Sequence, residues 1–350
     1  MQSMEFHKAI ISGIACAVPD NRILSDKYKD VFGEATVERF KGATGIEGRY
    51  MSDGNQTISD LSYVAAKALF EKKGITGEDI DAVVLITQTP DYRTPSTSFL
   101  LHKRLGIKKD CLVFDVNLGC SGYVNGIYVV AGLIESGVIN RALLLVGDSE
   151  TNHQVTDDTS FTMMFGDAAS ATIMERGEGT IRGMIRSDGE GYNMLMSPVP
   201  GARFPGVSPS DGAEFQSRMN GDDVFLFTIT KVPKLFKEFY KTFDCNESDF
   251  DYFVFHQANL MIINQIAKKL KLPMEKVPIS LHEYGNTEGA SIPVSIVDIC
   301  EKNNIDKKLN LITSGFGIGL SWGVVSFEVD SKDIIPMIVT NECFEEGKNV

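Results

Sequence analysis

The 350-residue sequence predicts an α/β protein built from two related halves. Three observations predict this fold class. Apolar strands alternate with amphipathic helices, the order of these segments is the same in both halves, and corresponding positions lie about 166–170 residues apart. Because such alternation is typical of mostly parallel sheets covered by helices, we expect a pseudo-twofold α/β protein.

Each half contains the same series of segments. The series is helix, strand, helix, strand, tight turn, buried helix and two strands, and in the first half it covers residues 58–74, 81–87, 96–106, 111–137, 141–149 and 165–175. In the second half it covers residues 222–243, 251–256, 259–271, 277–303, 309–317 and 319–329. Between the halves, residues 187–215 are dense in Gly, Pro and Ser, which indicates a long connection, either at the substrate entrance or on the surface.

This organisation divides the chain into four parts. We expect an N-terminal half over residues 1–180, a connecting loop region over 181–216, a C-terminal half over 217–332 and a C-terminal extension over 333–350. The extension carries no recognisable motif, so it is expected either to cover a sheet edge or to pack in a dimer.

Composition excludes several classes of protein. A net charge of −13 argues against nucleic-acid binding, and no apolar run reaches the ~18–20 residues of a membrane span. The six cysteines are scattered without a C-x-x-C pair, which argues against a zinc site and a secreted disulfide framework and favours the cytoplasm. No P-loop and no G-x-G-x-x-G motif supports a nucleotide site.

Three chemically capable side chains fall where predicted strands end. Cys120 follows the strand LVFDV, His256 ends DYFVFH, and Asn286 follows VPISL. Ligands of open α/β folds gather at the carboxyl ends of strands. Because Cys120 and Asn286 occupy equivalent turns of the two halves, the pseudo-twofold symmetry is expected to bring them close together.

Each of the three residues suits a catalytic role. A cysteine at the start of a helix lies beside unpaired N–H groups and the positive end of the helix dipole, which lower the pKa of the thiol. The backbone N–H of Cys120 is placed to bind an oxyanion. His256 can donate a hydrogen bond or transfer a proton, and Asn286 can donate without titrating.

Each residue also has a structural interpretation when taken alone. A single cysteine after a strand is usually a small core residue, and a single His or Asn at a strand end is usually a loop residue or a helix cap. Their occurrence at equivalent positions of a duplicated fold favours catalysis.

The motifs together resemble the β-ketoacyl-acyl-carrier-protein synthase III family of the thiolase superfamily. The resemblance covers about residues 8–330 and depends on TGIEGRY, the Cys between strand and buried helix, FGDAAS, MNGDDVF, HQAN, GNT followed by SIP, and GFGIGLSWG. It implies a thiolase-like fold, with two βαβαβαββ halves in an α/β/α/β/α arrangement.

The resemblance also implies a mechanism. Cys120 would take an acyl group from a thioester, with the oxyanion held by the N–H groups of Cys120 and Ile318. A malonyl group on acyl carrier protein would then lose CO₂, and His256 and Asn286 would stabilise the enolate that attacks the acyl-enzyme. The product is a 3-oxoacyl thioester that starts a fatty acid. No metal or organic cofactor is implied, and the enzyme would be a homodimer.

The loops that would bind substrate depart from the family pattern. The resemblance places Phe316 and Gly317 of the GFGIG loop beside the substrate. Thr94 stands where some members have a Phe that shortens the partner's acyl pocket, so acyl groups longer than acetyl are expected to fit. The usual clamp for CoA is missing, since Ala43 replaces a common Arg, no Trp precedes TGI, and TNHQVTDDTS has no Arg.

Two further features concern charge. The resemblance places the carrier protein near the helix after HQAN, where Lys268 and Lys269 match basic positions, although Met261 replaces a common Arg and a solvated lysine face explains the pattern equally well. Glu288 in GNTEGAS is unusual, and it is interpreted as a surface residue or as one that touches substrate.

Other functions remain open on sequence alone. A specialised-metabolism synthase with a donor other than CoA is the main alternative, and a non-catalytic acyl-binding partner subunit is the alternative of another class. The Gly-rich loop lacks the second Cys of a biosynthetic thiolase, and the TGI and HQAN motifs argue against a chalcone-synthase-like enzyme. No Glu can be placed near Cys120 as the general base of a hydroxymethylglutaryl-CoA synthase.

Overall fold

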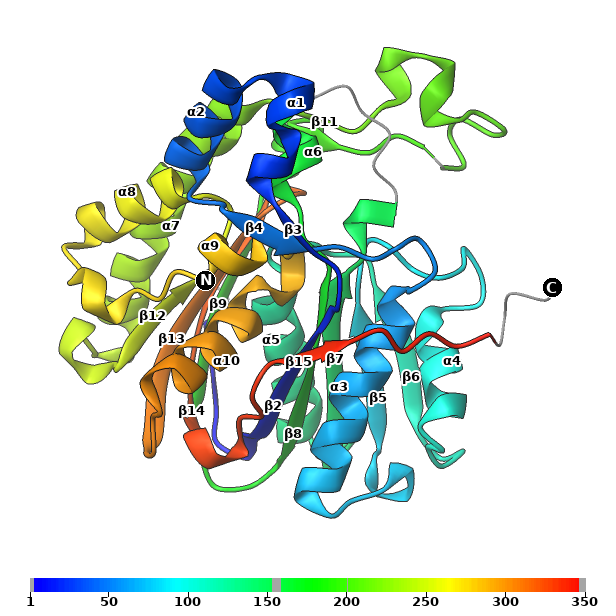
Figure 1. Ribbon diagram of the computed structural model, residues 1–350. Helices are drawn as coiled ribbons and strands as arrows, with labels where there is room; N and C mark the ends of the chain where they lie inside the picture. Colours follow the sequence, from blue (N-terminus) through cyan, green and yellow to red (C-terminus); the bar gives the residue numbers. More distant parts are fainter. Residues whose placement is uncertain (1–2, 153–158, 200, 346–350) are drawn as a thin grey trace.

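The computed structural model describes residues 3–152, 159–199 and 201–345, and two large mixed sheets form its centre (Figure 1). One sheet has six strands, in the order β15 (Ile338–Thr340), β2 (Ala9–Pro19), β8 (Ala168–Arg176), β7 (Arg141–Asp148), β5 (Ala82–Ile86) and β6 (Leu112–Val116). The other has five, in the order β1 (Ser3–Phe6), β9 (Ile181–Ser187), β14 (Ser321–Asp330), β13 (Lys308–Gly317) and β12 (Tyr252–Phe255). Two short ribbons pair β3 (Arg22–Leu24) with β4 (Gly48–Tyr50), and β10 (Leu195–Met196) with β11 (Arg218–Met219).

The helices complete five layers. α5 (Gly122–Glu135) and α10 (Ser291–Asn303) contact strands of both sheets and lie between them. α3 (Ile58–Lys73) and α4 (Thr97–Arg104) cover the outer side of the six-stranded sheet, and α7 (Gly221–Phe243) and α8 (Leu260–Leu270) cover the five-stranded sheet (Figure 1). The remaining α-helices of the described residues are α1 (Lys29–Phe32), α2 (Glu34–Thr44), α6 (Thr159–Met164) and α9 (Leu281–Tyr284). The predicted α/β/α/β/α arrangement is confirmed.

The two sheets repeat one strand order. Numbered along the chain, the first half gives β2-β8-β7-β5-β6 and the second gives β9-β14-β13-β12. The last two strands of each half occupy corresponding places, with β7 matching β13 and β8 matching β14. The duplication predicted from the segment series is therefore present in the sheets.

Three details of the prediction were wrong. The sheets are mixed rather than mostly parallel, because only three residues separate β13 from β14 and so short a connection permits only antiparallel pairing. Residues 277–280, predicted as a strand, are irregular and lead into α9. The predicted connecting loop begins as a strand, since β9 pairs with both β1 and β14.

The central helix α5 is apolar nearly all round because a sheet lies on each side of it. Tyr123, Val124 and Ile127 are fully buried. A Cβ at Gly126 would come within 2.7 Å of both Ile86 and Leu144, so this glycine permits the helix to pack directly on β5 and β7. The helix is thereby fixed in position, and with it the turn that precedes its first residue.

The C-terminal extension covers a sheet edge, one of its two expected placements. β15 pairs in parallel with β2, and Phe344 packs edge-on against Tyr63 and under the guanidinium of Arg104. Within the described part of the chain, no helix is both long and apolar enough to cross a membrane.

Candidate active site

Cys120 lies in the tight turn between β6 and α5. The turn is closed by a 2.6 Å hydrogen bond from the Gly122 N–H to the Gly119 carbonyl. Cys120 is only 6% exposed, so its thiol is largely removed from water. The buried helix behind the turn holds the sulfur in place.

The thiol of Cys120 contacts a carboxylate that the sequence analysis did not place. Its Sγ donates to Glu288 Oε2 at 2.7 Å, and Glu288 is 8% exposed. Interpretation of Glu288 as a surface residue was therefore wrong, as was the expectation that no Glu lies near Cys120. The available signal was its position, two residues after Asn286 in the turn equivalent to that of Cys120.

His256 follows β12 and lies beside Cys120 and Glu288. Its backbone N–H donates to the Ser314 carbonyl at 2.8 Å. In its side chain, Nδ1 lies 2.8 Å from the hydroxyl of Ser291 at the start of α10. The imidazole meets the ring of Phe316 edge to face, with centroids 5.5 Å apart. A ring nitrogen of His256, the sulfur of Cys120 and a carboxylate oxygen of Glu288 all lie within 4.8 Å of one another.

Asn286 supports this cluster from the adjacent turn. Its Oδ1 accepts the N–H of Glu288 at 3.0 Å, which leaves the amide NH₂ as a donor. Its backbone is anchored by hydrogen bonds to Met164 and Gly166, so the position of the amide is fixed relative to the six-stranded sheet. Asn286 is 4% exposed.

The glycine-rich loop closes over the sulfur. Gly317 has φ +156°, and a Cβ there would lie 2.7 Å from Cys120 Sγ, so only glycine fits. Backbone hydrogen bonds from Ile318 and from Cys120 itself lower the pKa of the thiol. Two backbone N–H groups thus lie next to the sulfur.

The net effect on the thiol is the reverse of the expected one. Burial and the adjacent Glu288 raise the pKa of Cys120 well above its usual value, and the N–H groups offset this only in part. The expected lowering of the thiol pKa followed from the helix terminus alone, whereas burial and the carboxylate both raise it. Burial also lowers the pKa of His256 to about 3, so the imidazole is neutral at physiological pH.

The other predicted residues lie outside this cluster. Thr94 is exposed in the loop before α4, and Lys268 and Lys269 are exposed in the last turn of α8. The amino group of Lys269 donates to the Ile229 carbonyl of α7 at 2.9 Å. Ala43 is half-buried in α2. Residues 153–158, predicted to lack a CoA-binding Arg, lie outside the described part of the chain.

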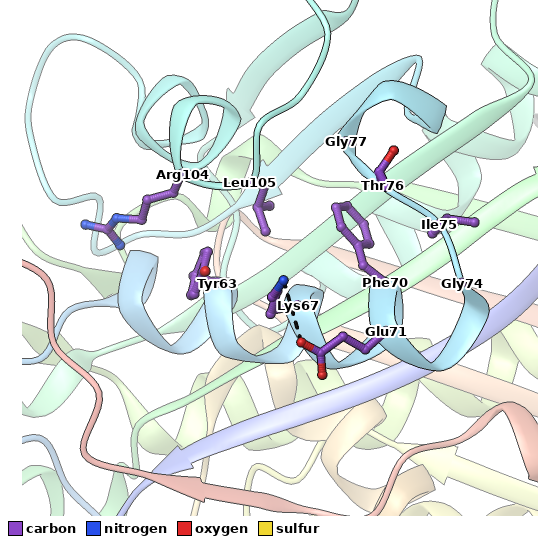
Figure 2. Close-up of a pocket in the computed structure, with 10 residues that line it drawn as sticks. All are labelled: Tyr63, Lys67, Phe70, Glu71, Gly74, Ile75, Thr76, Gly77, Arg104 and Leu105. Atoms are coloured by element: carbon purple, nitrogen blue, oxygen red, sulfur yellow. Dashed lines mark ion pairs between the residues drawn. The ribbon is translucent and has the colours of Figure 1, made fainter.

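Two other features could bind small ligands. A thiol, an imidazole and a carboxylate within 4.8 Å of one another are groups that a transition metal can bind, and we assign no metal to them. A surface pocket of about 260 Å³ lies between α3 and α4, where Lys67 pairs with Glu71 and Arg104 marks one end (Figure 2). None of the residues that line this pocket belongs to the cluster at Cys120.

Comparison with known proteins agrees with this geometry. The family model for 3-oxoacyl-[acyl-carrier-protein (ACP)] synthase III matches residues 114–189, and the model for its C-terminal part matches residues 241–329. A β-ketoacyl-[acyl-carrier-protein] synthase III of Clostridium perfringens is 33% identical over 89% of this chain and 96% of its own. A putative 3-oxoacyl-[acyl-carrier-protein] synthase 3 of Campylobacter jejuni is 32% identical over 91% and 93%. A crystal structure of a 3-oxoacyl-(acyl-carrier protein) synthase from Burkholderia xenovorans LB400 has a TM-score of 0.91 and 33% identity, and the match covers 97% of this chain and 99% of that chain.

The duplicated fold, with a buried cysteine at the start of its central helix, defines an acyltransferase of the condensing type within the thiolase superfamily. The chain belongs to the 3-oxoacyl-[acyl-carrier-protein] synthase III family. The resemblance drawn from the sequence motifs is confirmed.

Proposed function

We propose that this enzyme condenses an acyl thioester with malonyl-acyl-carrier protein, with loss of CO₂, through an acyl group on Cys120. The product is a 3-oxoacyl thioester, and the reaction initiates a fatty acid. One observation carries the proposal: the sulfur of Cys120 and a ring nitrogen of His256 lie within 4.8 Å of each other, and both residues are buried. The relatives that this chain matches are named for the same reaction class.

In the first step, the sulfur of Cys120 attacks the carbonyl carbon of the acyl thioester. The carbonyl oxygen gains negative charge, and the N–H groups of Cys120 and Ile318 are the donors available to it. Collapse of this intermediate expels the donor thiolate and leaves the acyl group on Cys120.

In the second step, the malonyl thioester loses CO₂ and becomes an enolate, with negative charge on its thioester carbonyl oxygen. A neutral His256 and the NH₂ of Asn286 donate hydrogen bonds to that oxygen, and neither group needs to change its protonation state. The enolate carbon then attacks the acyl group and frees the sulfur. No metal or organic cofactor takes part.

Residues around the site suggest three partners: a carrier protein, a second subunit and an acyl donor. Lys268 and Lys269 would dock an acidic carrier protein on α8, the helix that follows His256 in the chain. Thr94 would border the acyl pocket of a partner subunit in a cytoplasmic homodimer and leave room for acyl groups longer than acetyl. Ala43 stands where the family commonly has an Arg that binds CoA. Without that Arg, an acyl group on a carrier protein is as suitable a donor as acyl-CoA.

The proposal is tested by product formation. Purified enzyme is incubated with malonyl-acyl-carrier protein and matched acyl-CoA and acyl-carrier thioesters of increasing chain length. We expect a 3-oxoacyl-carrier product by mass spectrometry, with one CO₂ released per product and no added metal. Acyl transfer to the carrier without CO₂ release, or no product with any donor, would contradict a decarboxylating condensation.

Substitution of Gly317 by Ala should slow acylation of the enzyme by about 10²-fold, because a new methyl group would overlap the sulfur and displace it from the oxyanion donors. Single-turnover acylation, followed by intact mass, measures this rate. Gly42→Ala is the matched control, since a Cβ at Gly42 meets nothing within 4 Å. Equal rates in the two variants would show that the loop does not position the sulfur.

A further inference from the structure

Glu288 is held against the nucleophile by its own backbone. It has φ +47°, an uncommon conformation for a residue with a side chain and one that is concentrated at functional sites. The hydrogen bond from its N–H to Asn286 Oδ1 fixes this turn, and the carboxylate then reaches Cys120 Sγ at 2.7 Å. A Cβ at Gly119 would lie 2.2 Å from Gln88 Oε1 but at ordinary contact distance, 3.4 Å, from Glu288 Oε2, so the residue before Cys120 packs beside the carboxylate.

We propose that Glu288 is a further catalytic residue, which accepts the proton of the Cys120 thiol during acyl transfer and returns it to the departing thiolate. This inference rests on the proposed function, and it assigns the acid–base step of acylation to a side chain outside the Cys120, His256 and Asn286 group. Glu288 qualifies because its carboxylate oxygen is in direct hydrogen-bond contact with the reacting sulfur.

His256 is poorly suited to the same step. Its burial lowers the pKa of the imidazole to about 3, so the ring would hold a transferred proton weakly, and its Nδ1 is already engaged by Ser291. Burial raises the pKa of Glu288 to about 7, although its hydrogen bond with Cys120 lowers it in part. A group with this pKa can accept and release a proton near neutral pH. The two residues thus act in different steps. Glu288 transfers the proton in acylation, and the neutral imidazole of His256 donates a hydrogen bond in condensation.

Four titratable groups face Glu288 in the described part of the chain: Cys120, His256, Asp148 and Glu150. Burial, together with the charge of Glu288, raises the pKa of both Asp148 and Glu150 to about 8. Both carboxyls are therefore mostly protonated at neutral pH. Of these three carboxyls, Glu288 is the one whose oxygen is in hydrogen-bond contact with the sulfur.

The proton balance of the step is complete. As the bond from Cys120 Sγ to the acyl carbon forms, the S–H proton passes to Glu288, and the bond from the acyl carbon to the donor sulfur breaks. The departing thiolate takes the proton from Glu288, which returns to its carboxylate form. The net result is an acyl group on Cys120 and a neutral donor thiol, with no oxidant, reductant or further reactant.

The test compares wild type with Glu288→Gln, which keeps the size of the side chain but cannot accept the proton. Single-turnover acylation and alkylation of Cys120 by iodoacetamide are measured from pH 5.5 to 9.5 by intact mass. In wild type, both rates should rise through a step near pH 7. In Glu288→Gln this step should vanish from both profiles, and acylation at pH 7.5 should be at least about 10²-fold slower.

The control is Glu150→Gln, which removes a neighbouring buried carboxyl and should keep the step and most of the acylation rate. A step that survives in Glu288→Gln belongs to Asp148 or Glu150 and would overturn the proposal, as would an unchanged acylation rate. If Glu288→Gln fails to fold, the alkylation profiles of wild type and Glu150→Gln still test the proposal, because a wild-type profile without the step, or loss of the step in Glu150→Gln, would overturn it. Alkylation also requires no acyl donor, so a wild type that alkylates as expected but never acylates would overturn the proposed function and leave the proton pair in place.

Discussion

His256→Ala should still accept an acyl group on Cys120 but should decarboxylate malonyl-acyl-carrier protein at least about 10²–10³-fold more slowly than wild type. The imidazole is assigned to the enolate oxygen and not to the thiol proton, and loss of one such donor typically costs a factor of this size. Acylation is measured by intact mass in single turnover, and decarboxylation by release of labelled CO₂.

The control for this variant is His282→Ala. His282 is an exposed residue whose Nδ1 pairs with the Gly45 carbonyl, away from Cys120, and both reactions should persist. Normal decarboxylation by His256→Ala would contradict the role given to the imidazole. Loss of acylation in the same variant, with the fold intact by circular dichroism, would assign His256 to the thiol proton instead.

Cys120→Ala should lose condensation by at least about 10⁴-fold, because it removes the sulfur that is proposed to carry the acyl chain. It should nevertheless decarboxylate malonyl thioester, since His256 and Asn286 remain in place. The two variants therefore predict opposite patterns, with acylation alone in His256→Ala and decarboxylation alone in Cys120→Ala. Product formation, acyl adduct and CO₂ release are measured on the same samples.

Cys245→Ala is the matched control for the loss of a thiol. Cys245 is half-buried in the loop after α7, and its removal should change none of the three readouts. Residual condensation by Cys120→Ala above about one part in 10³ would show that a second nucleophile or a direct transfer operates.

The sequence was sufficient to predict where the main chemical groups meet. Strands of a duplicated α/β unit end at related places, so a Cys and an Asn in equivalent turns, and a His at a matching strand end, were expected to converge. The structure brings Cys120 and His256 within reach of each other and fixes Asn286 to the adjacent turn. The buried helix α5 was also predictable, because its apolar residues have no polar face.

The remaining features depend on tertiary contacts that no local pattern encodes. Glu288 is a charged residue in a polar turn, and its left-handed backbone conformation accompanies a side chain that turns inward to Cys120. The raised pKa of Cys120 likewise arises from burial and from a neighbour 168 residues away in sequence. Residues 277–280 have the composition of a strand, and their failure to pair was not visible in the sequence.

The central claim, that Cys120 carries the acyl group, is tested most directly by locating that group. Wild-type enzyme is incubated with an acyl-CoA or acyl-carrier donor, quenched in acid, digested and mapped by tandem mass spectrometry. The account predicts one acyl adduct per chain, on the peptide that contains Cys120, which disappears when malonyl-acyl-carrier protein is added before the quench. An adduct on another residue, or turnover to 3-oxoacyl product without any adduct at Cys120, would contradict it.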